Sequence, residues 1–404
     1  VDNTGSSATI TGNTVTGSYI QNLLGDAAVM ESNAYQNMIA ASTMVSNAAG
    51  YSALYINGGG TNTVTGSVMS NPAGYGIYLN NSAYNTISLS SAVSDNAGGY
   101  AGAYFSTSDS NTVSGTYMQN AQGYGTYFNS GSDYNTVSQS TMVSAILNGR
   151  GLLIVSSVGN AITGSWIHNA LGYGAQLDNY TTVSQSTITS NNGSGVPALY
   201  IGASSSTVTG SYIENVGSYA VQLVGSYNTI AQSTMITANT IGAALYMNGG
   251  DNNQVAGSFI QNLPGYAAQF TGGSNFNTIA QSSIISAATT VGRYGLYVLN
   301  SASNTVLNSY VAGSTAVYIA GSTGTVIGGS VLVATNTFGT ALAFTNGSVN
   351  LTIATSTLLA PSIGRGLTLN VGNAGVVSLS SVIFSGAARG LEISTQVTGS
   401  FSLV

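Results

Sequence analysis

Apolar and polar residues alternate in a pattern that returns about every 24 residues along the chain. Each copy starts at a position that is most often Asn, which we call the mark. The second residue after the mark is Val or Ile, with small polar residues on both sides, as in N-T-V-T-G-S-Y-I-Q-N from Asn13 and N-T-V-S-G-T-Y-M-Q-N from Asn111. This alternation predicts a strand with one buried face. A helix is excluded by the density of Gly, Ser, Thr and Asn, which are weak helix formers.

Each copy contains two further apolar segments. The seventh residue after the mark is usually Ile or Met, as in Ile20 and Met118, and this position predicts a second strand. A third segment reads A-L-Y-I at Ala53–Ile56 and G-I-Y-L at Gly76–Leu79. Glycines and short polar clusters separate the three segments and predict turns. The pattern therefore predicts an all-β fold, a parallel β-solenoid with three strands in each coil.

The marks divide the chain into about seventeen coils of roughly 24 residues, with a two-coil repeat near 49 residues. We place the marks at Asn13, Asn37, Asn62, Asn85, Asn111, Asn135, Asn160, Thr181, Ser206, Asn228, Asn253, Asn277, Asn304, Gly324, Leu351, Gly375 and Thr395. Asn tolerates left-handed geometry and can form stacked hydrogen bonds, so we expect it at a turn and in a ladder. Residues 1–303 form the regular body, and residues 304–404 read as a divergent continuation of the same single domain.

Aromatic residues explain the two-coil repeat. In one class of coil the sixth residue after the mark is aromatic, with Val68 as the exception, and in the other class an aromatic residue precedes the mark. The first class contains Tyr19, Tyr117, Trp166, Tyr212, Phe259 and Tyr310, and the second contains Tyr84, Tyr134, Tyr180, Tyr227 and Phe276. Adjacent coils about 4.8 Å apart would crowd rings stacked at every level, so packing accounts for the alternation.

Charge is scarce, which narrows the classes of function. Charged residues make up 3% of the 404 residues, lysine is missing, and the net charge is −6. Nucleic-acid binding requires clustered Lys and Arg, so this composition argues against it, and against binding to anionic membranes. No apolar run approaches the length of a membrane helix. Cysteine is also missing, so neither disulfides nor thiolate metal sites are expected.

The repeat resembles the parallel β-helix of the pectin-lyase-like superfamily. The resemblance rests on N-x-[VI]-x-x-[ST]-x-[IM], followed by G-Y-G-x-Y-[LF] and S-x-x-N, seen most plainly from Asn62 to Asn85, and it covers nearly the whole chain. It implies a right-handed helix of three parallel sheets. The superfamily includes polysaccharide lyases and hydrolases, phage tailspikes, adhesins and autotransporter passengers, so the resemblance leaves the activity open.

The residues needed for such enzymes are not found in the expected pattern. A lyase of this kind would need a carboxylate cluster for Ca²⁺ and a basic residue, and a hydrolase would need paired carboxylates. The acids scatter over the coil; Asp109 and Asp133, each two residues before a mark, are the best pair, and we interpret them as turn residues. His168, the only histidine, occupies a position that is Gln or, at Glu214, Glu in sister coils. We therefore expect no enzyme activity, no catalytic or metal-binding residue and no cofactor.

Three surfaces remain as candidates for binding. The arginines Arg150, Arg293, Arg365 and Arg389 precede a third strand in each case and are candidates for an anion or partner site. Tyr75, Tyr124, Tyr173 and Tyr266 share one register and are candidates for stacking on glycans. A threonine ladder that resembles the face of solenoid ice-binding proteins contains Thr14, Thr16, Thr63, Thr65, Thr112, Thr207 and Thr209.

The two ends of the sequence favour assembly. Both ends have the character of the repeat, and candidate contacts are Val1, Ile10, Phe401, Leu403 and Val404. Unpaired strand edges on a weakly charged solenoid favour head-to-tail stacking. The main hypothesis is an extracellular structural protein, secreted or on the cell surface, that forms filaments with copies of itself or the stalk of an adhesin. The alternatives are a carbohydrate-binding or carbohydrate-processing β-helix and an ice-binding solenoid.

Overall fold

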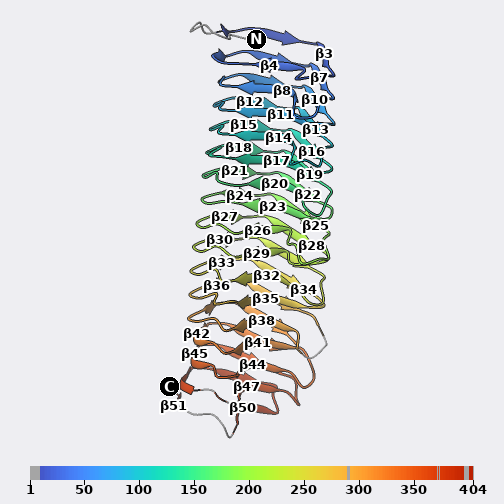
Figure 1. Ribbon diagram of the computed structural model, residues 1–404. Helices are drawn as coiled ribbons and strands as arrows, with labels where there is room; N and C mark the ends of the chain where they lie inside the picture. The colour runs from blue at the N-terminus through green and yellow to red at the C-terminus, as the bar shows by residue number, and fades with distance from the viewer. Residues whose placement is uncertain (1–9, 289–291, 371, 373, 395–399, 404) are drawn as a thin grey trace. The chain divides into compact units, whose positions relative to one another are not determined.

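The computed structural model describes residues 10–288, 292–370, 372, 374–394 and 400–403. These residues form strands and turns without a helix, in about 16 turns of about 24 residues. Strands that are one turn apart along the chain lie side by side in parallel sheets (Figure 1). The predicted all-β parallel solenoid is confirmed. The chain divides into two compact units, Val1–Asn192 and Gly193–Val404, which are described separately.

The first unit contains three parallel sheets, which we name sheets I, II and III in the order in which their strands follow each mark. Sheet I is formed by β2 (Thr14–Thr16), β6 (Met38–Ala40), β9 (Thr63–Thr65), β12 (Thr86–Ser88), β15 (Thr112–Ser114), β18 (Thr136–Ser138), β21 (Ala161–Thr163) and β24 (Thr182–Ser184). Sheet II is formed by β3 (Tyr19–Asn22), β7 (Thr43–Ser46), β10 (Val68–Asn71), β13 (Ser91–Ser94), β16 (Tyr117–Asn120), β19 (Thr141–Ser144), β22 (Trp166–Asn169) and β25 (Thr187–Ser190). Sheet III is formed by β4 (Ala28–Met30), β8 (Ser52–Asn57), β11 (Tyr75–Asn80), β14 (Ala101–Ser106), β17 (Tyr124–Asn129), β20 (Arg150–Ile154) and β23 (Tyr173–Leu177). A short parallel pair is formed by β1 (Ile10–Thr11) and β5 (Ala34–Tyr35), which come directly before β2 and β6 along the chain.

The second unit repeats the three sheets. Its sheet I is formed by β27 (Thr207–Thr209), β30 (Thr229–Ala231), β33 (Gln254–Ala256), β36 (Thr278–Ala280), β39 (Thr305–Leu307), β42 (Thr323–Gly328), β45 (Val349–Ala354), β48 (Ala374–Ser380) and β51 (Ser400–Leu403). Sheet II is formed by β28 (Tyr212–Asn215), β31 (Thr234–Thr237), β34 (Phe259–Asn262), β37 (Ser283–Ser286), β40 (Tyr310–Gly313), β43 (Val331–Ala334), β46 (Thr357–Leu359) and β49 (Ile383–Ser385). Sheet III is formed by β26 (Leu199–Ile201), β29 (Val221–Leu223), β32 (Ala243–Asn248), β35 (Tyr266–Thr271), β38 (Tyr294–Leu299), β41 (Thr315–Ala320), β44 (Thr340–Thr345), β47 (Arg365–Leu369) and β50 (Arg389–Ile393).

The core is built from the inward positions that the repeat predicts. In one turn of the first unit, Val113 of sheet I, Met118 of sheet II and Phe128 of sheet III are all buried. Phe128 stacks on Phe105 of the preceding turn, with ring centroids 4.5 Å apart. Each turn therefore places its apolar side chains against those of the next turn, and burial of this apolar surface stabilises the stack.

The asparagine of the mark forms a buried ladder, as the sequence predicts. Asn111 accepts hydrogen bonds at Oδ1 from the backbone N of Asn85 (2.8 Å) and from its Nδ2 (3.0 Å). The backbone N of Asn111 in turn donates to Oδ1 of Asn135, 2.8 Å away, and its Nδ2 donates to the Ser82 carbonyl. The ladder therefore supplies partners for backbone groups that would be buried without them.

The expectation that these asparagines take left-handed geometry is wrong. The left-handed residue is the one before the mark, as at Ser110 (φ 56°) and Tyr134 (φ 55°). Turning the chain at that residue directs the asparagine side chain inward, where it reaches the next turn. A second left-handed residue lies four positions after the mark, which explains why Gly115 (φ 55°) stands there, although Gln139 takes the same geometry (φ 48°).

Three marks near the end of the chain are wrong. Thr305 pairs with Val326 in register, so the mark of that turn is Thr325 and not Gly324. In the following turns the marks are Val377 in place of Gly375, and Phe401 in place of Thr395. Thr395 itself lies outside the described residues. All three lie where asparagine is lost from the mark, and the last two also follow a register irregularity between Val349 and Leu351 in β45.

Alternate turns carry aromatic residues at different positions, as predicted. In sheet II, Tyr117 pairs in register with Ser91 and Thr141, so the ring has small neighbours on both sides. Trp166 likewise lies between Thr141 and Thr187. This arrangement agrees with the interpretation that packing between turns sets the alternation.

Candidate functional site

The outward face of sheet III in the first unit carries a continuous column of tyrosines. Tyr55, Tyr78, Tyr104 and Tyr127 occupy matched positions in β8, β11, β14 and β17. Successive ring centroids are 5.1, 4.8 and 5.0 Å apart. Because β-strands alternate their side chains, the residues on either side of these tyrosines enter the core while the rings cover the outer face. Burial raises the pKa of Tyr78 and Tyr127, so their hydroxyls remain protonated at neutral pH.

Two of the four predicted glycan-stacking tyrosines, Tyr75 and Tyr124, join this column. Tyr75 lies parallel to Tyr104, with centroids 5.1 Å apart, and Tyr124 lies 5.0 Å from Tyr127. Burial, and then the neighbouring tyrosines, raise the pKa of Tyr75 far above its usual value. Tyr173 lies beneath Arg150, whose guanidinium carbon is 4.5 Å from the ring centroid. These residues are therefore half-buried parts of an aromatic surface and not isolated platforms.

The second unit has its own aromatic cluster on sheet III. Tyr294 and Tyr318 lie face to face, with centroids 4.4 Å apart and an interplanar angle of 3°. Tyr266, the fourth predicted stacking residue, lies 5.6 Å from Tyr297 and accepts a hydrogen bond at its hydroxyl from Nη1 of Arg293 (3.2 Å). The stacked pair Tyr294 and Tyr318 forms the aromatic edge of a hollow.

That hollow, which we call the sheet III groove, has a volume of about 370 Å³. It crosses β38, β41, β44, β47 and β50 and is lined by Gly292, Tyr294, Thr315, Tyr318, Thr340, Ala343, Arg365, Thr368, Asn370 and Glu392. Thr368 is buried, and among the described residues its Oγ1 has no hydrogen-bond partner. A buried hydroxyl without a partner is costly, so a ligand hydroxyl in the groove would gain by pairing with it.

The charged end of the groove is an ion-paired triad. Glu392 pairs through Oε2 with Nε of Arg365 and through Oε1 with Nη1 of Arg389, the latter at 3.1 Å. Burial acts to raise the pKa of Glu392, but hydrogen bonds from the two guanidinium groups outweigh it and hold this pKa below its usual range. Glu392 is therefore ionised at neutral pH, and the triad carries a net positive charge.

The predicted shared register of the arginines is mostly confirmed. Arg150, Arg365 and Arg389 are the first residues of β20, β47 and β50, and Arg365 pairs in register with Arg389. Arg293 lies one residue before β38. Sequence reasoning missed the other groove residues. Glu392 could have been found by aligning R-G-L-E-I at Arg389 with R-G-L-T-L at Arg365, which places it beside the arginines.

The best acid pair from the sequence has a structural role. Oδ1 of Asp109 accepts a hydrogen bond from the backbone N of Asp133 (2.8 Å), and Oδ1 of Asp133 accepts one from the backbone N of Val158 (2.7 Å). Each carboxylate thus binds the backbone of the next turn. His168 shares a hydrogen bond of 2.8 Å between Nδ1 and Thr189 Oγ1 and stacks on Trp166. Within the described residues, no group of three or more His, Asp or Glu side chains could hold a metal ion.

The predicted threonine ladder lies on sheet I of both units, in β2, β9, β15 and β27. In the first unit the structure brings Thr14 and Thr63 to either side of Met38. The second column is likewise interrupted, since Thr16 and Thr65 flank Ala40. In the second unit, the column that begins at Thr207 continues with Thr229 and then Gln254. The column that begins at Thr209 continues with Ala231 and Ala256.

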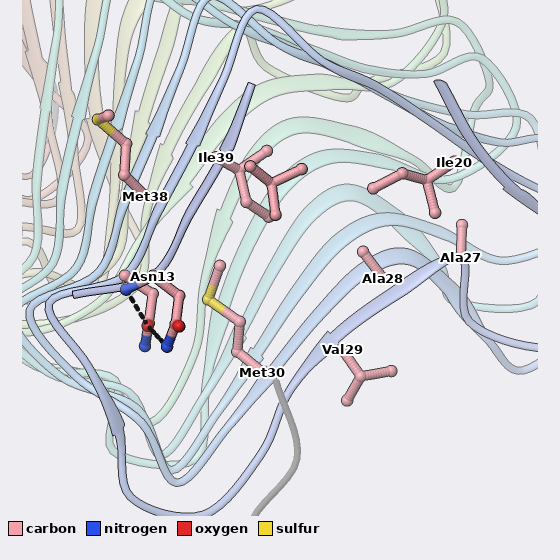
Figure 2. Close-up of a pocket in the computed structure, with 10 residues that line it drawn as sticks. Asn13, Ile20, Ala27, Ala28, Val29, Met30, Met38 and Ile39 are labelled. Atoms are coloured by element: carbon pink, nitrogen blue, oxygen red, sulfur yellow. Dashed lines mark hydrogen bonds between the residues drawn. The ribbon is translucent and has the colours of Figure 1, made fainter. Parts of the chain in front are cut away.

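The residues proposed for end-to-end contacts are only partly described. Val1 and Val404 lie outside the described residues. Ile10 lies in β1, and Phe401 and Leu403 lie in β51, which pairs with β48. The first described turn also contains an apolar cavity of about 260 Å³, and Figure 2 shows Ile20, Met30 and Ile39 around it. Its lining combines the inward residues Ile20, Met30 and Ile39 with the exposed Met38, so it lies at the edge of the core in this turn.

The family of the chain follows from its sequence and agrees with the fold. A family model described as "Right handed beta helix region" matches residues 1–163, 52–200, 150–288 and 197–358. The chain belongs to this family of right-handed parallel β-helix proteins, as the resemblance predicted. No curated protein matches the sequence.

Several solved structures are similar in fold. The Dettilon tailspike protein gp208 is 12% identical, over 81% of this chain and 62% of the tailspike, with a TM-score of 0.39. The DFA-IIIase from Arthrobacter chlorophenolicus A6, solved in complex with GF2, is 12% identical, over 79% of this chain and 84% of that one, with a TM-score of 0.41. The matching chain of the Vag8–C1 inhibitor complex is 14% identical, over 96% of this chain and 100% of that one, with a TM-score of 0.41. This chain thus spans less than two thirds of the tailspike.

Proposed function

We propose that the protein is an extracellular carbohydrate-binding β-solenoid that holds a glycan in the sheet III groove. The observation that carries the proposal is the stacked pair Tyr294 and Tyr318 at the edge of a hollow that also contains Arg365 and Glu392. Aromatic faces pack against the apolar faces of sugar rings, and a few convergent polar groups fix the orientation of the hydroxyls. Thr368 offers one further hydroxyl to such a ligand.

Binding without cleavage is favoured by the state of the carboxylate. Glycosidases use two carboxyl groups, one of which serves as an acid with a raised pKa. In the groove Glu392 is the only carboxylate among the described lining residues, and its pKa is lowered by Arg365 and Arg389. A carboxylate held ionised between two guanidinium groups is a good acceptor for sugar hydroxyls and a poor proton donor.

A glycan array followed by titration calorimetry with a responding glycan tests this proposal. We expect Tyr318→Ala and Arg365→Gln to weaken binding by about tenfold each, because one loses ring contact and the other loses a charged donor. Tyr310→Ala is the matched control, since Tyr310 is an exposed ring on sheet II of the same unit. An array without a responding glycan, or groove variants that bind as well as the control, would contradict the proposal.

Assembly into filaments is the second candidate function. It is favoured by the weak charge of the chain, since charged residues make up 3% of the sequence and opposing repulsion is small. Copies of the same chain would be the partner, with contacts at Ile10, Phe401 and Leu403. Electron microscopy distinguishes this function from the first, because glycan binding requires no fibres.

A further inference from the structure

A second aromatic surface lies at the corner where the chain passes from sheet III to sheet I. It consists of the aromatic residues that precede the mark in alternate turns, which we call the corner row. Its members are Tyr84, Tyr134 and Tyr180 in the first unit and Tyr227 and Phe276 in the second. Their exposed fractions run from 58% to 67%, and none of them lines the sheet III groove.

The backbone at this corner does not favour aromatic residues. Each member of the corner row has a left-handed backbone, with φ between 55° and 60°. This geometry suits Gly and Asn and strains bulky residues. The turns in between place Ser110, Gly159 and Asn252 at the same position with the same sign of φ. The fold therefore accepts small residues at this corner, and the aromatic residues are retained against a conformational cost.

The hydrogen bonds that hold the turn at this corner come from main-chain atoms. The backbone N of Tyr134 donates to the Val158 carbonyl (3.0 Å), and that of Phe276 to the Ala302 carbonyl (2.9 Å), so the turn is held by main-chain atoms. Phe276 has no hydroxyl, so the aromatic ring is the feature that all five members of the corner row share. The ring of Tyr134 lies over Gly159 of the next turn, where an added Cβ would lie 2.6 Å from its Cδ1. One face of that ring thus covers the protein, while much of the side chain remains in solvent.

The spacing and charge of the corner row define its ligand. Members two turns apart in one unit are separated by roughly 10 Å, since stacked strands lie about 4.8 Å apart. Asp109 and Asp133 flank the row, whereas all four arginines begin or precede strands of sheet III, at the opposite end of those strands. We propose that the corner row binds an extended, uncharged β-1,4-linked polysaccharide. Alternate sugars of such a flat chain present the same face, so every second sugar would stack on one ring.

The geometry allows a test that separates binding from folding. In the triple variant Tyr84→Asn, Tyr134→Asn and Tyr180→Asn, the rings are replaced by the residue found at Asn252, which tolerates this φ. With hydroxyethyl cellulose as the probe in affinity electrophoresis, we expect affinity to fall at least about tenfold. Thermal unfolding is expected to start at the same temperature or higher, because strain at three positions is relieved.

Two controls and one competitor complete the experiment. Ser110→Asn changes the same corner in an intervening turn and is expected to leave binding unchanged. The triple Tyr→Phe variant at the three positions is expected to keep binding, since the ring face suffices. Polygalacturonate, an acidic polymer, is expected to bind more weakly than the uncharged probe. Retained binding by the triple Asn variant, a large loss of its thermal stability, or a preference for polygalacturonate would each overturn the proposal.

The result is independent of the groove. Tyr318→Ala removes a groove contact and leaves the corner row intact, so it is expected to bind hydroxyethyl cellulose like the unmodified protein. Conversely, the triple Asn variant is expected to keep the glycan that the groove binds. Failure of one proposal can therefore be told apart from failure of the other.

Discussion

A buried asparagine in this protein stabilises two turns at once. Asn111 is almost fully buried, accepts two hydrogen bonds from Asn85, and donates to the Ser82 carbonyl and to Asn135. A side-chain amide has one acceptor and two donors, and here the acceptor and Nδ2 both have partners. The sequence alone indicated a ladder because Asn recurs at the mark. It could not show which neighbouring residue turns the chain, because several residue types take left-handed geometry here.

Loss of one member of this ladder should be costly. We expect Asn111→Ala to lower the free energy of unfolding by about 3 kcal/mol, because buried groups of Asn85 and the Ser82 carbonyl would lose their partners. Denaturant unfolding followed by circular dichroism measures the change. Thr112→Ala, at an exposed neighbour, is the control and should change stability by less than about 0.5 kcal/mol. Equal effects of the two variants would show that the ladder contributes little.

The single histidine should make stability depend on pH. Burial lowers the pKa of His168 below 6.5, so the folded state favours the neutral ring. The unfolded state then binds a proton more readily, and stability present above about pH 6.5 falls as the pH drops through that value. His168→Gln, which introduces the residue found at Gln119, should remove this part of the dependence. Thermal unfolding from pH 8 to pH 5 checks it, and identical profiles for both proteins would contradict it.

At the scale of strands and sheets, the regular body was predictable and the groove was not. Val, Ile and Met at fixed offsets from the mark identified the inward positions of sheets I and II through Val306, since each turn there keeps the same register. Beyond that point asparagine is lost from the mark, and from β45 onward a register irregularity also shifts the marks. The groove is lined by residues from five strands of sheet III. The sequence shows which residues share a position in successive turns, as Tyr266 does with Tyr75, but it does not show where the surface of the sheet is hollowed.

Sheet I provides the test of ice binding. Ice-binding faces rely on a flat and regular hydroxyl array, whereas here Met38 and Ala40 interrupt the two columns between Thr14 and Thr63 and between Thr16 and Thr65. We therefore expect no thermal hysteresis from the unmodified protein in a nanolitre osmometer. A double variant, Met38→Thr with Ala40→Thr, extends the array and serves as the comparison. Hysteresis in the unmodified protein would restore the ice-binding alternative.

At the scale of the whole molecule, the positive charges share one place in the turn. All four arginines begin or precede strands of sheet III, and two of them enclose Glu392 beside the groove. The remaining surface is wetted by Ser, Thr, Asn and Tyr, so long-range repulsion between molecules is weak. Because few charges repel one another, the same composition also favours association between copies of the chain.

Association should therefore respond to substitutions at the sequence ends more than to salt. We expect the purified chain to form fibres visible by negative-stain electron microscopy, and Phe401→Lys with Leu403→Lys to disperse them, since charge opposes the burial that head-to-tail contacts need. Leu171→Lys adds a charge at an exposed position far from both ends of the sequence and is the control. Because surface charge is sparse, salt from about 0.01 M to 1 M should change fibre formation little. Dispersed molecules at every salt concentration would contradict assembly while leaving glycan binding untouched, because a groove built within one unit needs no second copy.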